Sequence, residues 1–217
     1  MLVLASSSPR RQQLLTLFGI DFQIQPADVD ERVVANEKPE EYVLRLAYSK
    51  VMSITRHSPD QRIVIAADTA VVDGDQILGK PENAQQATKM LRNLRGRSHY
   101  VYTGLAGRDG ITELVISDLC VTEVYMRRYQ DAEIADYIAS GDPMDKAGAY
   151  AIQNRGFNPV QEISGCYANV VGLPLCHLAE MLTRFQVDLP DNITHGCRTP
   201  LGYNCRLSET IVQLNQQ

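Results

Sequence analysis

Tryptophan is missing from this 217-residue sequence, and its five cysteines contain no C-x-x-C pair. Without such spacing the cysteines indicate neither a disulfide framework nor a standard zinc site, so we expect free thiols. The sequence also lacks an apolar run of 18 residues, and its short apolar start, MLVLA, cannot serve as a signal peptide. We therefore expect a cytoplasmic protein without a membrane span.

An excess of positive charge is also absent. The chain has 21 basic and 26 acidic residues, and its formal net charge is −5. No global positive field attracts a nucleic acid polymer, so any anionic ligand must be held by a local cluster. Apolar residues make up 44% of the chain, which is typical of a globular protein with one core.

The order of the predicted elements indicates an α/β fold with a mixed sheet and flanking helices. Ser8 as N-cap, Pro9 at the first helical position and Gly19 beyond the end bracket the first helix. The run IVIAADTAVV predicts a strand covered on both faces, and Asp73-Gly74 predicts a hairpin turn. Further strands are expected at 2–5, 21–25, 98–107 and 111–126, and further helices from residue 39, at 82–94, 130–139 and 174–185.

A polar segment follows the last predicted helix. We expect residues 1–187 to form the folded domain and residues 188–217 to form a loose tail. His195, Cys197 and Cys205 in that tail lack the fourth ligand of a usual zinc site. The histidines at positions 57, 99 and 177 have no partner that the sequence makes evident.

The first candidate site is the segment SSSPRR at residues 6–11. It combines hydroxyl groups, the free amides of a helix N-terminus and two guanidinium groups, all of which favour a phosphate. An ordinary capped helix with two solvated arginines remains the alternative.

The second candidate site is formed by carboxylates. Asp68 lies in an apolar strand, where an isolated charge costs several kcal/mol, on the order of any buried unpaired ion. Mg²⁺ held with a second carboxylate, from Glu31 or Asp30, would compensate it, as would an ion pair. Lys50, on an apolar helical stripe, and Lys80, in a loop, are candidate cations for phosphate, although solvated lysines are common.

Five ordered motifs make this sequence similar to one family. SSSPRR, ADTAV, LGKP, DKAGAYAIQ and YANVVGLPL resemble the motifs of the Maf nucleotide pyrophosphatases, over about residues 2–185. The resemblance implies two lobes around a nucleotide cleft, similar to the inosine triphosphate pyrophosphatases. It also implies a homodimer and a divalent cation, usually Mg²⁺, with Mn²⁺ as the alternative.

The resemblance also implies residue roles. Asp68 would be the catalytic carboxylate and proton acceptor, with Glu31 as the second metal ligand and Lys50 and Lys80 completing the catalytic site. The residues that would bind the substrate are Ser6, Ser8, Arg10, Arg11, Thr69 and Gln153.

Within the family, Thr69 and Gln153 resemble the branch that acts on dTTP and UTP, with Arg10 as a further specificity determinant. The Gln153 amide offers a donor and an acceptor to a uracil or thymine edge. Asn154 and Cys166 depart from the Gly and Ser that are usual in the family at these positions. The same chemistry on 7-methyl-GTP therefore stays open.

The predicted reaction is hydrolysis of a nucleoside triphosphate to monophosphate and pyrophosphate. Water oriented or deprotonated by Asp68 attacks the α-phosphorus, and cationic side chains stabilise the leaving pyrophosphate. The alternative from another class is a nucleotide-binding regulator of cell division, because the family is associated with septum formation and binding needs the same residues.

Overall fold

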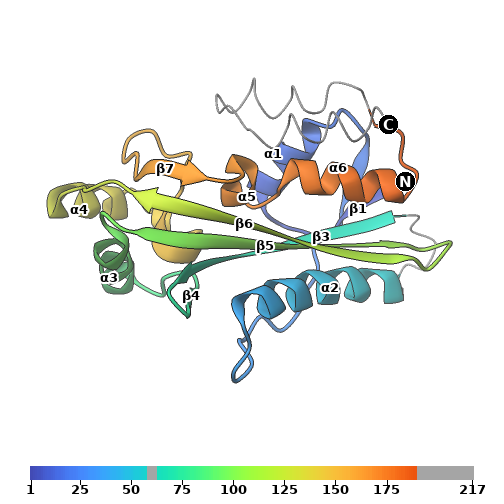
Figure 1. The fold of residues 1–217 in the computed structure, drawn as a ribbon, viewed down its shortest axis with the longest axis horizontal. Helices are drawn as coiled ribbons and strands as arrows, with labels where there is room; N and C mark the ends of the chain where they lie inside the picture. The colour runs from blue at the N-terminus through green and yellow to red at the C-terminus, as the bar shows by residue number, and fades with distance from the viewer. Residues whose placement is uncertain (58–62, 190–217) are drawn as a thin grey trace.

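The computed structural model describes residues 1–57 and 63–189. In this part of the chain, one seven-stranded sheet has the order β2-β1-β3-β5-β6-β7, and β4 pairs with β3. The long strands run along the molecule, and helices cover both of their faces (Figure 1). The strands are β1 Leu2–Leu4, β2 Phe22–Ile24, β3 Ile63–Asp73, β4 Gln76–Leu78, β5 Ser98–Asp109, β6 Val115–Met126 and β7 Val160–Ser164.

The sheet is mixed, as predicted. Strand β1 runs parallel to β2 and β3, whereas every other pairing is antiparallel. Strand β3 is buried on both faces, as its apolar run indicates. Because side chains alternate along a strand, Asp68 faces one side of the sheet and Thr69 faces the other.

Helix α2, Pro39–His57, covers the face to which Asp68 belongs (Figure 1). Its apolar side packs Ala47 and Val51 against Val64 and Ala66 of β3. Gly104 of β5, the register partner of Asp68, makes this close approach possible. A Cβ atom on Gly104 would lie 2.5 Å from the backbone of Val43 in α2. The helix therefore passes directly over the strand pair that carries Asp68.

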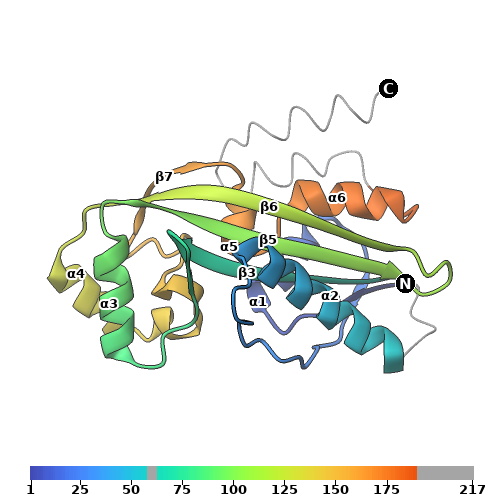
Figure 2. The same ribbon diagram turned by 60° about the horizontal axis from the view of Figure 1, so that its bottom comes forward.

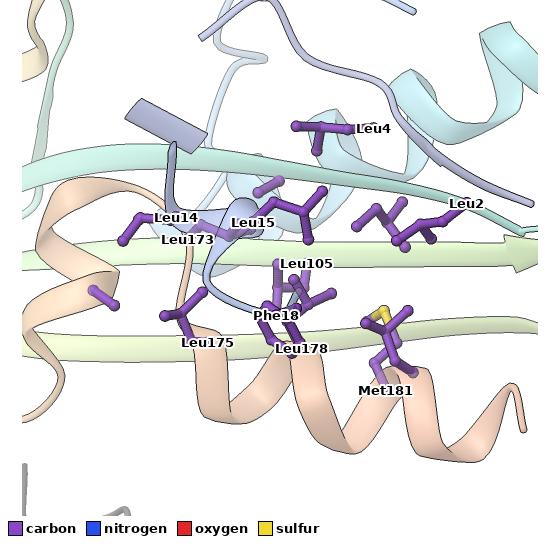
Figure 3. Packing of buried hydrophobic residues seen from close by; sticks show 14 of the residues in the cluster. Leu2, Leu4, Leu14, Leu15, Phe18, Leu105, Leu173, Leu175, Leu178 and Met181 are labelled. Atoms are coloured by element: carbon purple, nitrogen blue, oxygen red, sulfur yellow. The ribbon is translucent and has the colours of Figure 1, made fainter. Parts of the chain in front are cut away.

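The opposite face holds the largest apolar cluster. Helices α1, Pro9–Thr16, and α6, Leu175–Arg184, pack there. Figure 3 shows α1 side chains next to α6 and the sheet, with Leu14, Leu15, Phe18, Leu105, Leu178 and Met181 labelled. Burial of each such side chain contributes about 1.5–3 kcal/mol, so this cluster fixes α1 and the loop before it.

A second apolar cluster lies at the other end of the long strands. Helices α3, Ala84–Leu94, and α4, Asp131–Ala139, pack there beside β4 (Figures 1 and 2). Between α4 and α6 the chain forms two short 3₁₀ turns, η1 Asp142–Asp145 and η2 Ala147–Ala149, then strand β7 and a short helix α5, Tyr167–Val171. The two clusters form the two lobes that were expected.

Most predicted elements are confirmed with shifted ends. The turn between β5 and β6 lies at 110–114, later than predicted, because Asp109 extends the ladder and its N–H donates to Leu114 O. Strand β7 and helix α5 were not predicted. The tail from residue 190 onward, with His195, Cys197 and Cys205, lies outside the described residues. Among the described helices, none combines the length and apolar character of a membrane span.

Candidate functional site

A cavity of about 460 Å³ opens between the two lobes, beside the middle of β3. Strand β1 pairs with β3 only as far as Ile65, and β4 pairs with it from Val71 onward. The edge of β3 between these points therefore faces the cavity instead of a neighbouring strand. Ligands of open α/β sheets bind in such crevices beyond the carboxyl ends of strands.

The cavity brings all ten predicted site residues together, although they are up to 147 positions apart in the sequence. They enter from the loop after β1, from α1, from the loop after β2, from α2, from β3, from the loop after β4 and from the segment after η2. These lining residues are Ser6, Ser8, Arg10, Arg11, Glu31, Lys50, Asp68, Thr69, Lys80 and Gln153.

Lys50 joins the two predicted metal-binding carboxylates. Its Nζ lies 2.5 Å from Asp68 Oδ1 and 2.7 Å from Glu31 Oε1. Lys50 and Asp68 are both buried, whereas the Glu31 side chain is half exposed. Tyr42 of α2 fixes the Glu31 loop, because its hydroxyl donates to Glu31 O at 3.0 Å.

Burial and charge act in opposite directions on these carboxylates. Burial raises the pKa of Asp68, and the charges of Lys50 and Arg11 only partly offset that rise. Partial burial also acts to raise the pKa of Glu31, but the hydrogen bond and charge of Lys50, with the charge of Lys80, leave this pKa below its ordinary value. Asp68 is therefore the more basic of the two carboxylates, which suits a proton acceptor.

Arg11 is tied into the wall of the cavity on the other face of β3. It donates to Gly172 O at 2.9 Å, to Thr69 Oγ1 at 3.1 Å and to Ser6 Oγ at 3.4 Å. Thr69 Oγ1 in turn lies 2.9 Å from Thr103 Oγ1 on β5. Burial lowers the pKa of Arg11, although the negative charge of Asp68 opposes this shift. The arginine thus fixes the position of Thr69.

Arg10 is free where Arg11 is fixed. In residues 1–57 and 63–189, no hydrogen bond or ion pair holds the side chain of Arg10, Lys80 or Gln153. Ser8 is the N-cap of α1, but its side chain makes no capping bond, so the amides of the first turn stay available. Arg10, Lys80 and Gln153 all line the same cavity.

The cavity is positive within an acidic chain. Five cations line it against three carboxylates, a surplus of two positive charges, although the chain as a whole carries −5. The cations are Arg10, Arg11, Lys50, Lys80 and Lys146, and the carboxylates are Glu31, Asp68 and Asp145. Such a local surplus beside free helix amides attracts a polyanion.

The segment that carries Gln153 is held by one carboxylate, that of Asp142. Its Oδ2 accepts from Tyr137 Oη at 2.7 Å and from Asn154 Nδ2 at 3.0 Å. Its Oδ1 lies 3.0 Å from Lys146 Nζ. Sequence reasoning missed this hub because Lys146, Tyr137 and Asn154 lie four, five and twelve residues from Asp142, in different elements and loops with no common period.

Two of the histidines have partners that the sequence did not make evident. His99 Nε2 lies 2.7 Å from Tyr150 Oη, and His177 Nδ1 lies 2.7 Å from Asp118 Oδ2, so both histidines have partners. These partners are 51 and 59 residues away in the sequence, where no local pattern finds them. Among the described cysteines, none forms a disulfide bond, so Cys120, Cys166 and Cys176 are thiols, as expected.

Cys166, one of the departures from the family motif, caps α5. Its Sγ accepts a hydrogen bond from Asn169 N at 3.4 Å. A serine hydroxyl at an N-cap position makes the same kind of bond. This substitution therefore keeps the local geometry of the segment that ends at Gly172.

The carboxylate pair fits a divalent cation. Glu31 Oε1 and Asp68 Oδ1 converge on a single point, which the Lys50 ammonium now approaches. Mg²⁺ is commonly bound by one or two carboxylates together with substrate phosphates. In the described residues, no group of three or more His, Cys, Asp or Glu side chains is placed to hold a metal by itself.

Comparison with known proteins supplies the family. The model of the Maf-like proteins matches residues 1–185. The chain belongs to the Maf family. A dTTP/UTP pyrophosphatase of Anaeromyxobacter dehalogenans is 48% identical over 87% of this chain and 96% of its own length. Proteins of the same name from Geotalea uraniireducens and Thermoanaerobacter sp. are 47% and 45% identical, over 84% of this chain and 94% and 95% of their own lengths.

Solved structures show weaker likenesses to this Maf protein. The Staphylococcus aureus Ham1 protein aligns with a TM-score of 0.47 and 15% identity, over 86% of this chain and 99% of that protein. A dITP/XTP pyrophosphatase from Mycobacterium abscessus aligns with a TM-score of 0.37 and 12% identity, over 59% and 75% of the two chains. Family membership therefore rests on the sequence.

Proposed function

We propose that this protein is a nucleoside triphosphate pyrophosphatase that hydrolyses dTTP and UTP to the monophosphate and pyrophosphate. The observation that carries the proposal is the Lys50 centre, where two carboxylates and an ammonium meet at the edge of a positive cavity. The relatives named dTTP/UTP pyrophosphatase support the substrate.

In the proposed reaction, Asp68 orients the attacking water and takes its proton at a carboxylate oxygen. The raised pKa of Asp68, which burial causes, suits this transfer. The water oxygen forms a bond to the α-phosphorus, and the bond from that phosphorus to the bridging oxygen breaks. Pyrophosphate then leaves with its charge matched by the cations of the cavity.

The cations of the cavity have different roles in this reaction. Arg10 and Lys80, which no protein acceptor holds in the described residues, bind the β- and γ-phosphates. Ser6, Ser8 and the first amides of α1 bind the remaining phosphate oxygens. Arg11 keeps Thr69 in place on the wall of the cavity.

A divalent cation, Mg²⁺ or Mn²⁺, completes the proposal. Glu31 and Asp68 would hold it, and when bound it would neutralise phosphate charge in the transition state. Lys50 then keeps the two carboxylates close together and limits their mutual repulsion. A homodimer in the cytoplasm, and a folded domain of residues 1–187 followed by a tail, are further parts of the proposal.

The test is a product assay with a matched control. The wild type, Asp68→Asn and the exposed hairpin variant Asp75→Asn receive Mg²⁺ and dTTP, UTP, CTP, GTP or 7-methyl-GTP, and pyrophosphate and orthophosphate are quantified. We expect pyrophosphate from dTTP and UTP, retained in Asp75→Asn and lost in Asp68→Asn. Turnover of only a guanine nucleotide would overturn the substrate, and tight binding without turnover would favour a regulator.

A further inference from the structure

The third carboxylate of the cavity, Asp145, is separate from the metal-binding pair. It belongs to η1, in the lobe that also contains α3 and α4. Burial acts to raise the pKa of both Glu31 and Asp145. The charges of Lys50, Lys80 and Arg11 lower the pKa of Glu31, whereas those of Lys146 and Arg10 lower the pKa of Asp145. A carboxylate repels phosphate, so the triphosphate would bind to Arg10 and Lys80 and not to Asp145 itself.

Lys146 holds Asp145 and has no capacity left for a ligand. Its buried Nζ donates to the Asp142 carbonyl oxygen and lies 3.0 Å from Asp142 Oδ1 and 2.5 Å from Asp145 Oδ1. An ammonium group has three donors, and these three acceptors use them all. Lys146 therefore orients Asp145 instead of binding substrate.

This arrangement leaves the second oxygen of Asp145 without a side-chain donor in the described residues. Lys146 is the one side chain in the described residues that donates to Asp145, and it contacts Oδ1. The Asp145 side chain is 72% exposed although it lines the cavity. Burial acts to raise its pKa, but the hydrogen bond and charge of Lys146 hold this pKa below its ordinary value. At neutral pH the second oxygen is thus only an acceptor.

The base of the proposed substrate presents a matching donor. Uracil and thymine carry an N3–H between two carbonyl groups, whereas cytosine has an unprotonated N3. The cavity lining also contains Gln153, whose amide has no protein partner in the described residues. The Gln153 amide can donate to one carbonyl of the base, and the Asp145 carboxylate lines the same cavity as a charged acceptor for the N3–H.

We propose that Asp145 is a specificity-determining residue that accepts the N3–H of uracil or thymine, while Gln153 donates to a neighbouring carbonyl group. The inference rests on the proposed pyrimidine nucleotide substrate and adds a residue for the base. Asp142 and Lys146 are positioning residues in this arrangement, because they act through Asp145.

Three substrates and two variants test the proposal. We would measure kcat and KM of the wild type, Asp145→Ala and Asp145→Asn with UTP, CTP and 3-methyl-UTP, which lacks the N3–H. A hydrogen bond to a charged group corresponds to about a 10- to 100-fold preference. We expect the wild type to prefer UTP over 3-methyl-UTP by that factor, and Asp145→Ala to reduce the preference to near unity.

Asp145→Asn tests the proposal in the opposite direction, because it should shift the substrate preference towards CTP. Its amide can donate to N3 of cytosine, so kcat/KM for CTP should rise relative to UTP by about tenfold or more. Asp136→Asn, an exposed carboxylate change on α4 of the same lobe, should leave every ratio unchanged. An equal loss for all three substrates in Asp145→Ala would show a structural role and overturn the proposal, as would a wild-type preference for CTP.

Measurements of nucleotide binding test the role of Asp145 independently of the proposed hydrolysis. Titration calorimetry of UMP and CMP needs no turnover, and the wild type should bind UMP more tightly by about 10-fold, with the difference lost in Asp145→Ala. If no triphosphate is hydrolysed but this difference appears, the enzyme proposal fails and the role of Asp145 stands. If hydrolysis occurs and Asp145→Ala keeps the UMP preference, the role of Asp145 fails alone.

Discussion

Lys50 and Asp68 form a buried ion pair in which the Nζ to Oδ1 distance is 2.5 Å. The pair joins α2 to β3 at the point where Gly104 lets the helix approach the sheet. It has a third member, Glu31, whose Oε1 lies 2.7 Å from the same Nζ. The two carboxylates thus contact the same cation, so removing the cation and removing one carboxylate should affect stability unequally.

The first prediction concerns stability at this centre. Lys50→Met should lower the unfolding free energy by about 3–5 kcal/mol, because it leaves buried Asp68 without its closest cation. Asp68→Asn should cost less, since Lys50 keeps Glu31 as a partner and a buried charge is removed. Urea denaturation of both variants at pH 7 measures the difference. Equal losses would show that the pair does not carry the stability we assign to it.

The second prediction concerns the metal. EDTA should abolish pyrophosphate release, and added Mg²⁺ should restore it. Glu31→Gln should raise the Mg²⁺ concentration for half-maximal activity by about tenfold, because one anionic ligand is lost. Its melting temperature should change little, since the Glu31 side chain is 54% exposed. Glu82→Gln, an exposed change outside the cavity, is the control and should keep the wild-type Mg²⁺ dependence.

The sequence predicts the fold through local signals. The Ser8-Pro9 start, the apolar run of β3 and the Asp73-Gly74 hairpin all specify backbone geometry within a few residues, and the structure confirms each. Strand β7 lacks such a signal, because it has no buried residue and no apolar alternation, and antiparallel pairing with β6 alone defines it.

The candidate site was predictable only in part. Motif resemblance predicts which residues approach one another. It does not predict which side-chain donors already bond to other protein groups and which remain available to a ligand. Arg10 and Arg11 are neighbours in one motif, yet Arg11 bonds to Gly172 and Thr69 whereas Arg10 has no partner in the described residues. Bonds between residues 161 and 58 positions apart depend on how the two lobes pack, which residue spacing does not encode.

The third prediction concerns the approach of α2 to the sheet. Gly104→Ala should lower the unfolding free energy by at least about 1–3 kcal/mol, because the new Cβ would lie 2.5 Å from the backbone of Val43. For a chain of this size, that loss lowers Tm by roughly 2–4 °C per kcal/mol. Gly156→Ala, whose Cβ would meet only Asn154 Oδ1 at 3.5 Å, should be near neutral. A Gly104→Ala variant with the wild-type Tm would contradict this packing.

The fourth prediction concerns pH. Burial lowers the pKa of His99 to about 4, so the folded state holds it neutral. Below the unfolded value near 6.5 the unfolded chain binds the extra proton, and stability falls as pH falls from 6.5 towards 4. Between pH 6.5 and pH 4, protonation of His99 in the unfolded chain should lower the free energy of unfolding by about 3 kcal/mol. His99→Gln keeps a partner for Tyr150 without titrating, so its stability should show a shallower acid decline.

His177 provides a control of opposite sign. The hydrogen bond to Asp118 raises the pKa of His177, so its stabilisation is complete below the unfolded pKa and is lost as pH rises through the folded one. Urea denaturation of His99→Gln and His177→Gln between pH 4.5 and 8 should show these opposite trends relative to wild type. Parallel curves for wild type and His99→Gln would refute the assignment for His99.

The last prediction concerns Asn154, which departs from the family motif and follows Gln153. Its Nδ2 donates to Asp142 Oδ2 at 3.0 Å, and its Oδ1 accepts from Phe157 N at 2.8 Å. These two bonds, each contributing about 1 kcal/mol, fix the turn that presents Gln153. Asn154→Ala should therefore raise KM for dTTP and UTP by about 3- to 10-fold with little change in kcat.

A matched neighbour separates this positioning role from a general effect on the loop. Arg155→Ala removes an exposed side chain that makes no hydrogen bond in the described residues, and it should keep the wild-type KM. Asn154→Gly restores the usual family residue but adds backbone freedom, so we expect its KM to be at least as high as that of Asn154→Ala. A lower KM in Asn154→Gly would mean that the asparagine obstructs the base instead of holding Gln153 in place.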